Sequence, residues 1–519
     1  MLSRKLVLSC FEVFCVLLIG AVVRFAYENP TVHFDEFFHI LAASSWVTDG
    51  TLSIADGSYH RARFFTYVVG VSYQLFGESV WASRLPSLVA GVVLIGAVFW
   101  WSRRVSGRLA GWLAAMFLCF APGSINLSQM SRFYMLQALC LWLTSISVYY
   151  LVTVCRSWGS GVMTVLFGFG MAVLAASLQI SSLIGLGALG LWAAVILGWR
   201  LRRWESTAQR RGIVIVLIVL VLAVTALGVQ EGRVVDLFDQ YQYAPAWADA
   251  DRINLAYYHR SYLESYGLFW FLFPVAFIVA IAKCWTPALF CGIVFSVVFV
   301  LHSFGGQKAE RYLFYAFPFF FIVWGMALSR ILPALQHQFA QVLGRLFGSK
   351  QSLIVVVGWF GVTVVFGLSL HYTQASHTTR DMINPINDIR HRYLRADWAS
   401  AVPVLRQIEG ESELVVASAG PAAIYYLGRV DVCLSRTVLG DRAEFAQDDK
   451  VGHPVISTPS SLDRIMQESA SGLIVVEEIH WRRNWGVPEQ SADFILRHTE
   501  SVPLPDRSGL MAFRWPPRF

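Results

Sequence analysis

A short run of acidic and imidazole side chains follows the first apolar segment of the chain. It reads His33-Phe-Asp-Glu-Phe-Phe-His39. Charged groups near a bilayer are costly unless they are solvated or functional, so Asp35 and Glu36 are candidates for a functional site. The structural alternative is a helix over residues 36–47 that Asp35 caps. The two histidines and Asp35 could also ligate a divalent metal, but their spacing fits no standard site, so no cofactor is indicated.

Two further runs combine cations with aromatic or turn-forming residues. One, 302–312, places Gly305-Gly306 before two cations, and the other, 131–135, reads Ser-Arg-Phe-Tyr-Met. Arginine matches phosphate geometry bidentately, so these runs suit an anionic ligand. The alternatives are an ordinary hairpin for the first run and an interfacial anchor for the second. The candidate phosphate- or substrate-binding residues in these runs and in the first loop are Arg61, Arg63, Arg132, Tyr134, His302, Lys308, Arg311 and Tyr312.

The composition requires that most of the chain supply apolar spans. Of 519 residues, 56% are hydrophobic and only 14% are charged, whereas soluble domains carry about 25% charged residues. A transmembrane helix needs about 20 apolar residues, which predicts a polytopic α-helical membrane protein with about eleven spans. They lie near 6–23, 81–101, 109–127, 135–153, 161–178, 181–198, 212–229, 267–282, 286–301, 312–329 and 353–370. Pro122 and Gly123 make the third the weakest, and the run 64–76 is too short to cross and should lie at the interface.

Loop charge predicts the orientation of these spans. Arginine and lysine gather after the even-numbered spans, so those loops and the N-terminus should be cytoplasmic. Arg4 and Lys5 could mark a signal peptide, but no small-residue cleavage site follows, so the run after them is interpreted as the first span. The C-terminus and the segments 24–80 and 230–266 should then be outside. The cations expected on the outer side are Arg61, Arg63, Arg84, Arg132, Arg252, Arg260, Lys308 and Arg311, and Arg84 suits a membrane anchor.

Charge and cysteine usage exclude several classes of function. The net charge is +7, but the chain from Tyr372 onward holds 16 basic and 19 acidic residues, so the basic excess lies among the spans. No basic domain for nucleic acid is indicated. The eight cysteines contain no CxxC spacing, so neither a zinc site nor a disulfide framework is expected.

The tail after the last span has a different pattern. Helical and strand-like segments alternate from Asp397 onward, which predicts a small α/β domain. We therefore divide the chain into a transmembrane module 1–371 with an external catalytic loop 24–80, an interfacial linker 372–396 and an extracytoplasmic α/β domain 397–519.

The motifs, in their order, resemble the GT-C glycosyltransferases related to dolichyl-phosphate-mannose protein mannosyltransferases and the bacterial lipid A aminoarabinose transferase. Asp35-Glu36 follows the first span, Arg61-Ala-Arg63 leads to Gln74-Leu-Phe-Gly77, and Ala82-Ser-Arg-Leu-Pro-Ser87 opens the second span. Ser131-Arg-Phe-Tyr134 opens the fourth span, and Lys308-x-x-Arg311-Tyr-Leu opens the tenth. The resemblance covers roughly residues 1–330. Many relatives keep an acid in the loop before the fourth span, and residues 133–137 here have none.

The resemblance implies a mechanism and its partners. Asp35 would be the catalytic base with Glu36 as the second candidate, while Lys308, Arg311 and Arg132 would hold the lipid phosphate. The protein would be a multi-pass protein of the inner membrane that moves a sugar from a polyprenyl-phosphate carrier to an envelope acceptor by inverting displacement. The acceptor could be a lipid, a glycan or a protein. The helices 36–47 and 64–76 would form the rim where the carrier enters.

Three other functions are open to the same sequence. A secondary transporter would place charges at mid-membrane in broken helices and show paired repeats, and neither pattern is present. A non-catalytic envelope-assembly protein could keep the same fold, and replacement of Asp35 would separate it from an enzyme. Another polyprenyl-linked enzyme, such as a polymer ligase, would share the same carrier chemistry.

Overall fold

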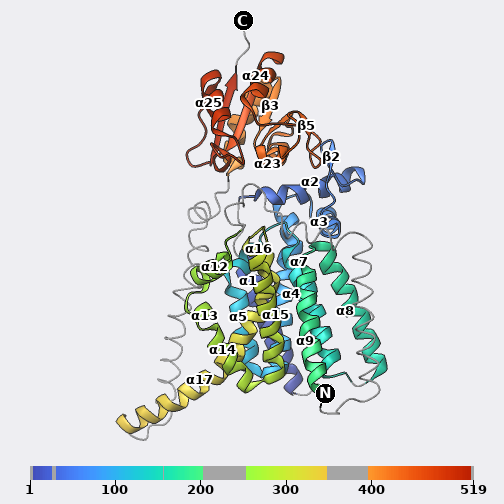
Figure 1. Cartoon of the computed structure of the whole chain (residues 1–519), viewed down its shortest axis with the longest axis vertical. Helices are drawn as coiled ribbons and strands as arrows, with labels where there is room; N and C mark the ends of the chain where they lie inside the picture. The colour runs from blue at the N-terminus through green and yellow to red at the C-terminus, as the bar shows by residue number, and fades with distance from the viewer. Residues whose placement is uncertain (1–3, 26–30, 156, 203–252, 348–395, 516–519) are drawn as a thin grey trace.

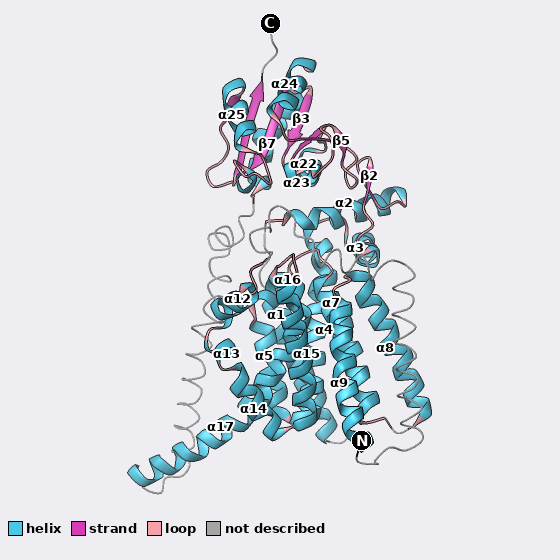
Figure 2. Ribbon diagram, in the orientation of Figure 1, coloured by secondary structure: helices cyan, strands magenta, loops and turns pink. Residues whose placement is uncertain are grey.

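The structure is a computed structural model that describes residues 4–25, 31–155, 157–202, 253–347 and 396–515. A bundle of long helices forms one part of it, and a helix-covered sheet stands at one end of the bundle (Figure 1). The short helices α2 (Phe34–Asp49) and α3 (Arg63–Phe76) lie between the two parts, as Figure 2 also shows.

Six helices in the described ranges are long and apolar enough to cross a membrane. They are Val80–Ser106 (α4), Tyr134–Thr153 (α7), Trp158–Leu178 (α8), Ser182–Trp199 within α9 (Ser182–Arg202), Trp285–Phe304 (α15) and Glu310–Gln338. The last of these combines α16 (Glu310–Leu313), a 3-10 turn and α17 (Phe317–Phe347), and α1 (Arg4–Phe25) covers the first predicted span. The predicted spans 212–229 and 353–370, with Arg252, lie outside the described residues, so the count of eleven stays a prediction.

Two predicted spans are broken helices. Helices α5 (Arg108–Phe120) and α6 (Pro122–Ser128) meet at an angle of 61°, because Pro122 removes a backbone donor and clashes with a continuing helix. Buried Arg24 stabilises the break: its guanidinium donates to the carbonyl of Cys119 (3.3 Å) and to Ser124 Oγ (2.6 Å). Polar backbone inside an apolar bundle needs such internal partners.

The second broken span, predicted at 267–282, covers two short helices, and a third short helix precedes it. They are α12 (Tyr257–Tyr266), α13 (Leu268–Phe271) and α14 (Phe273–Lys283). Gly267, with a positive φ of 47°, separates the first two, and Pro274 lies in the first turn of α14.

Helix α3 has the exposed apolar stripe of an interfacial helix. Its outward residues Phe64, Tyr67, Val71 and Leu75 recur every three or four positions, and Leu75 is 70% exposed. The opposite face is buried, with Phe65 and Val69 fully covered. This two-sided pattern supports the expectation that 64–76 lies along the membrane surface.

The C-terminal part is a seven-stranded sheet in the order β5-β6-β4-β3-β7-β9-β8. Strands β6, β4, β3 and β7 are parallel, and β5, β9 and β8 add antiparallel edges. Val415 and Ala417 of β3 face one core, and Val416 between them faces the other. The strands are β3 (Leu414–Ala417), β4 (Val432–Leu434), β5 (Ala446–Gln447), β6 (Pro454–Ile456), β7 (Gly472–Glu477), β8 (Glu500–Val502) and β9 (Leu510–Trp515).

Helices cover both faces of this sheet. Those on one face include α21 (Trp398–Glu411) and α22 (Gly420–Leu427), and those on the other include α24 (Pro459–Glu468) and α25 (Glu489–His498). Helix α23 (Arg436–Leu439) follows β4. Residues 372–395 of the predicted linker lie outside the described ranges, and the location of the sheet relative to a membrane remains a prediction.

Candidate active site

Helix α2 begins at Phe34, and an unusual cap fixes its first turn. His33 is the N-cap residue: its Nδ1 accepts the backbone N–H of Asp35 (3.1 Å), and its own N–H donates to Glu36 Oε1 (2.8 Å). This reciprocal pair is a capping box with histidine in the place usually taken by serine or threonine. The expectation that Asp35 itself caps a helix over 36–47 is therefore wrong.

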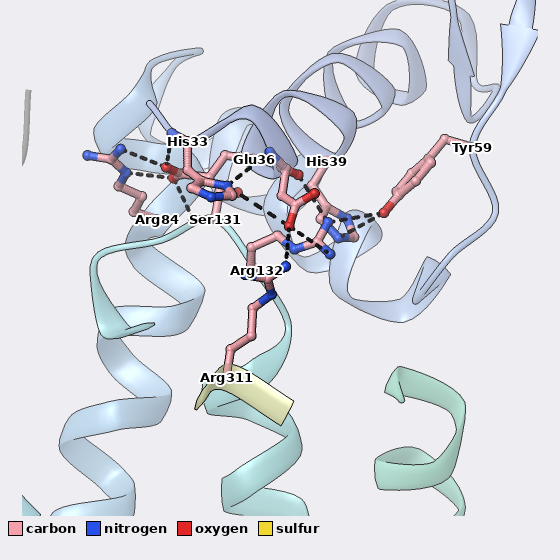
Figure 3. A network of polar contacts seen from close by, with 9 residues as sticks. His33, Glu36, His39, Tyr59, Arg84, Ser131, Arg132 and Arg311 are labelled. Carbon is pink, nitrogen blue, oxygen red and sulfur yellow. Dashed lines mark hydrogen bonds and ion pairs between the residues drawn. The ribbon is translucent and has the colours of Figure 1, made fainter. Parts of the chain in front are cut away.

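Glu36 points away from Asp35 into a buried ion pair. Arg84 Nε and Nη2 donate to its two carboxylate oxygens at 2.8 and 3.0 Å, and the backbone N–H of Ser131 donates at 2.7 Å. Both partners are buried, with side-chain exposure of 0% for Glu36 and 2% for Arg84. The pair ties α2 to α4 and to the loop before α7 (Figure 3). Glu36 is therefore held in a buried ion pair, and its role as a second candidate for the base stays a prediction. Arg84 is buried as its partner and is not exposed as a membrane anchor would be.

The Asp35 carboxylate faces two arginines that come from different parts of the bundle. Its Oδ2 lies 3.9 Å from Arg132 Nη2 and 3.7 Å from Arg311 Nη2, and the side chain is 24% exposed. Burial alone would raise the pKa of Asp35. The charges of Arg132 and Arg311, with His33 and Arg61, outweigh burial and hold this pKa well below its ordinary range. The carboxylate is therefore ionised at neutral pH.

The two guanidinium groups are held by neighbours other than the Asp35 carboxylate. Arg132 Nη1 donates to the backbone carbonyl of Asp35 (3.0 Å), and its guanidinium carbon lies 5.0 Å from the centroid of the Phe133 ring. The Arg311 guanidinium lies 5.2 Å from the centroid of the Tyr312 ring. Nε of each arginine is buried without a hydrogen-bond partner in the described part of the chain. Unsatisfied donors on fixed cations suit an anionic ligand.

A second set of polar side chains lies on the far side of Arg132. Tyr59 OH accepts a hydrogen bond from Arg132 Nη1 (3.3 Å) and lies 3.5 Å from His39 Nε2, while His39 Nδ1 lies 2.9 Å from Thr66 Oγ1. Burial lowers the pKa of His39 well below its ordinary value, and the charges of Arg132 and Arg61 lower it further. His39 is thus a neutral ring in a hydrogen-bond chain (Figure 3).

The residues of the hypothetical metal trio do not converge. His33 caps α2, whereas His39 contacts Thr66. Among the residues that the structure describes, no three His, Cys, Asp or Glu side chains are grouped to hold a metal ion.

Among the remaining predicted site residues, Arg61, Tyr134 and Tyr312 lie near the central arginines, and Arg63 lies at the surface. Arg61 lies near the site, with its guanidinium 5.4 Å from the Phe133 ring and a hydrogen bond to Gln179 Oε1 (3.1 Å). The rings of Tyr134 and Tyr312 lie 6.2 Å apart beside the two central arginines. Arg63 is exposed at the start of α3.

His302 and Lys308 have contacts of their own. His302 Nε2 lies 2.8 Å from Tyr315 OH, which donates to the carbonyl of Ser181 (3.0 Å). Lys308 is buried, and its Nζ donates to the carbonyl of Gly305 (2.6 Å). The structure therefore places Arg132 beside Arg311 at Asp35, whereas Lys308 donates a hydrogen bond within its own loop.

Sequence reasoning assigned no role to Tyr59, Thr66 or Ser131, although Ser131 is the first residue of the motif 131–135. Tyr59 follows a two-residue strand and belongs to no motif, so only its contacts reveal it. The position of His39 carried a usable signal, because residues four apart lie on one face of a helix and His39 is four residues after Asp35.

The arrangement can bind an anion and remove a proton at neighbouring positions. Fixed guanidinium groups stabilise negative charge that collects on a leaving phosphate. An ionised, partly exposed carboxylate next to them can accept a proton from a hydroxyl group.

Among the comparisons with known proteins, the one with solved structures shows the fold. The sequence matches no protein-family model and no curated protein. Solved structures with a similar fold include ArnT from Cupriavidus metallidurans bound to undecaprenyl phosphate, at a TM-score of 0.59 and 15% identity over 99% of this chain and 98% of ArnT. The apo form of ArnT gives 0.60 and 16% identity over the same shares.

A second similar structure is the archaeal oligosaccharyltransferase AglB from Archaeoglobus fulgidus, in complex with an inhibitory peptide and a dolichol-phosphate. Its TM-score is 0.56 at 12% identity, over 90% of this chain and 69% of AglB. ArnT and AglB are both GT-C glycosyltransferases, so the recognised fold is confirmed.

Proposed function

We propose that this chain, which has the fold of the GT-C glycosyltransferases, transfers a sugar from a polyprenyl-phosphate carrier to an acceptor of the cell envelope. The observation that carries the proposal is the Asp35 carboxylate beside the guanidinium groups of Arg132 and Arg311. The undecaprenyl phosphate and dolichol-phosphate bound to ArnT and AglB support the class of carrier. The sugar donor, the envelope acceptor and the bilayer are the proposed partners.

The proposed reaction is a single inverting displacement. Asp35 accepts the proton of an acceptor hydroxyl, whose oxygen attacks the anomeric carbon of the sugar. The bond from that carbon to the phosphate oxygen breaks, and its electron pair leaves with the lipid phosphate. Arg132 and Arg311 stabilise the charge that develops there. Glu36 and Arg84 hold the turn that presents Asp35 and take no proton in this scheme.

The membrane arrangement is part of the same proposal. Nine of the predicted spans fall on described residues, and the loop charges favour a cytoplasmic N-terminus in the inner membrane. The catalytic loop 24–80 and the α/β region 397–519 would then both be outside, on the side where the carrier presents its sugar.

Loss of one envelope modification is the expected result of deleting the gene. Mass spectrometry of envelope glycolipids and glycoproteins should show one sugar missing from one acceptor class. The wild-type gene should restore the sugar, whereas a gene encoding Asp35→Asn should not. An unchanged envelope, together with no transfer by purified protein from a panel of polyprenyl-phosphate sugars, would contradict the proposal.

Arg132→Gln and Arg311→Gln are each expected to weaken binding of undecaprenyl phosphate about ten- to a hundredfold, because a hydrogen bond to a charged group contributes about 1.5–3 kcal/mol. Titration of the full chain in lipid nanodiscs measures this affinity. Arg464→Gln, which removes an exposed arginine of helix α24, is the matched control and should bind as wild type.

Lys308→Gln tests the assignment that the sequence motif suggested. Because Lys308 donates to the carbonyl of Gly305, its loss should weaken carrier binding less than the loss of either arginine. Strong loss in Lys308→Gln with normal binding in both arginine variants would move the phosphate site to the loop 302–308.

A further inference from the structure

We propose that Tyr59 is a positioning residue for Arg132 and that the C-terminal sheet, through its loop 448–452, holds Tyr59 in place. This inference rests on the proposed function, because it assigns to the C-terminal sheet a part in binding the carrier phosphate. Tyr59 belongs to none of the sequence motifs. The C-terminal sheet takes no part in the displacement reaction proposed above.

The first step is a backbone contact between the first external loop and the sheet. Strands β1 (Ser53–Ile54) and β2 (Gly57–Ser58) form a hairpin that follows α2. The N–H of Gly57 donates to the carbonyl of Val451 (3.0 Å), and the N–H of Ser58 donates to the carbonyl of Asp449 (3.4 Å). The hairpin therefore extends the backbone pairing of the loop that joins β5 to β6.

Two glycines show how close this approach is. A Cβ atom on Gly57 would lie 2.4 Å from the carbonyl carbon of Lys450, and one on Gly452 would lie 2.4 Å from that of Asp56. Gly57 is free of positive φ, so its lack of a side chain serves the contact and not a turn. The two backbones touch without room for a methyl group on either side.

The contact also has an apolar and aromatic part. Phe37 of α2 packs against Tyr425 and Tyr426 at the end of α22, with ring centroids 5.4 and 5.8 Å apart. Lys450 of the same loop lies 5.0 Å over the Phe38 ring. Helix α2 and the hairpin are thus held against the C-terminal region by backbone hydrogen bonds to the loop 448–452 and by ring contacts with α22.

Tyr59 connects the hairpin to Arg132. It directly follows β2, is 4% exposed and stacks on Phe38 at a centroid distance of 5.3 Å. Its backbone N–H donates to the carbonyl of Leu52 (3.0 Å), which closes the hairpin. A tyrosine held at its backbone and on its ring has one orientation for its hydroxyl, and that hydroxyl accepts from Arg132 Nη1.

The hydroxyl has a complete set of partners. Because it accepts from Arg132, its own proton is available for His39 Nε2, and Nδ1–H of His39 can then donate to Thr66 Oγ1. Burial raises the pKa of Tyr59, so the phenol stays protonated. The chain from Thr66 to Arg132 therefore fixes Nη1 of the guanidinium, while Nη2 faces the Asp35 carboxylate at 3.9 Å.

Fixing the arginine in advance should matter for affinity. A long, flexible side chain loses rotamer freedom when it binds an anion, and a side chain already held in the bound orientation avoids that loss. Loss of the Tyr59 hydroxyl should therefore weaken carrier binding although Tyr59 itself does not contact the carrier.

Tyr59→Phe and Gly57→Ala test the two steps in the full chain. Both are expected to weaken undecaprenyl phosphate binding about three- to thirtyfold, by loss of one hydrogen bond to a charged group or by displacement of the hairpin. Gly410→Ala, where a methyl group meets open space in α21, and Tyr150→Phe near the end of α7 are the matched controls and should bind as wild type.

A double variant distinguishes a positioning role of Tyr59 from a general effect on the structure of the site. If Tyr59 acts through Arg132, Tyr59→Phe should add no further loss of affinity to Arg132→Gln. Losses that multiply in the double variant, or normal affinity in Tyr59→Phe, would overturn the inference while Arg132→Gln alone still tests the proposed function. If Gly57→Ala does not fold, the isosteric Tyr59→Phe variant still decides the outcome. Failure of the wild-type chain to bind undecaprenyl phosphate would instead refute the proposed function itself.

Discussion

Asp35→Asn is expected to lower sugar transfer about 10²–10⁴-fold, because positioned proton transfer contributes about that factor and the amide cannot accept the proton. The substitution keeps the shape of the side chain and leaves the cap of α2 intact, since the cap belongs to His33. Carrier binding should not fall, because removal of the negative charge leaves Arg132 and Arg311 free for the phosphate. Steady-state transfer assays and carrier titrations of purified protein measure both quantities.

Asp49→Asn is the matched control, since Asp49 ends the same helix and is exposed. It should transfer at the wild-type rate. Normal turnover in Asp35→Asn would remove the carboxylate mechanism from the start of α2. Loss of turnover with an equal loss of thermal stability would assign Asp35 a structural role instead.

The pH dependence of the reaction follows from the same contacts. The pKa of Asp35 is held below its ordinary value, so the carboxylate loses its charge only when the pH falls well below that value of about 3.9. The profile of kcat/KM for the donor reports the free enzyme. It should therefore show no loss from protonation of Asp35 above about pH 4. The ion-pair contribution to stability has the same sign, since it is present above the unfolded-state pKa and is lost in acid.

Hydropathy predicted the positions of several long apolar helices, because a span depends on local composition. The predicted spans 81–101 and 135–153 lie within α4 and α7, and the predicted weakness at Pro122 is the observed 61° break. The short strands β5, β6 and β8 were not predicted, since two or three residues carry no alternating pattern. Their positions depend on pairing with strands that are distant in sequence.

The site was predictable only in its residue types. Sequence motifs proposed Asp35, Arg132, Arg311 and Lys308 for the site. The structure brings the first three together, whereas the ammonium group of Lys308 donates to the carbonyl of Gly305. Two adjacent acids cannot be ranked by spacing, because consecutive residues of a helix turn point in different directions. Contacts with Arg84 on α4 and with Ser131 assign Glu36 to the interior, and neither contact has a local signal in the sequence.

Arg84→Leu is expected to destabilise the protein by about 3–5 kcal/mol, because it leaves the Glu36 carboxylate buried without its cation. Both side chains of the pair are buried, with exposed fractions of 0% for Glu36 and 2% for Arg84. Arg464→Leu removes one partner of an exposed pair with Glu468 and should cost about 0–1 kcal/mol. The apparent unfolding temperature of each variant in detergent measures the difference.

Glu36→Gln completes the test of which acid is the base. The amide keeps an oxygen for Arg84 and for the N–H of Ser131 but loses the charge, so stability should fall, and activity should fall only as far as folded protein is lost. Refolded or low-temperature samples should therefore transfer sugar at near wild-type rates per folded molecule. A stable Glu36→Gln protein with no turnover, beside an active Asp35→Asn protein, would reassign the base to Glu36. That outcome would require the ion pair with Arg84 to open during the reaction, and Arg84→Leu should then change the pH profile of turnover in addition to lowering the unfolding temperature.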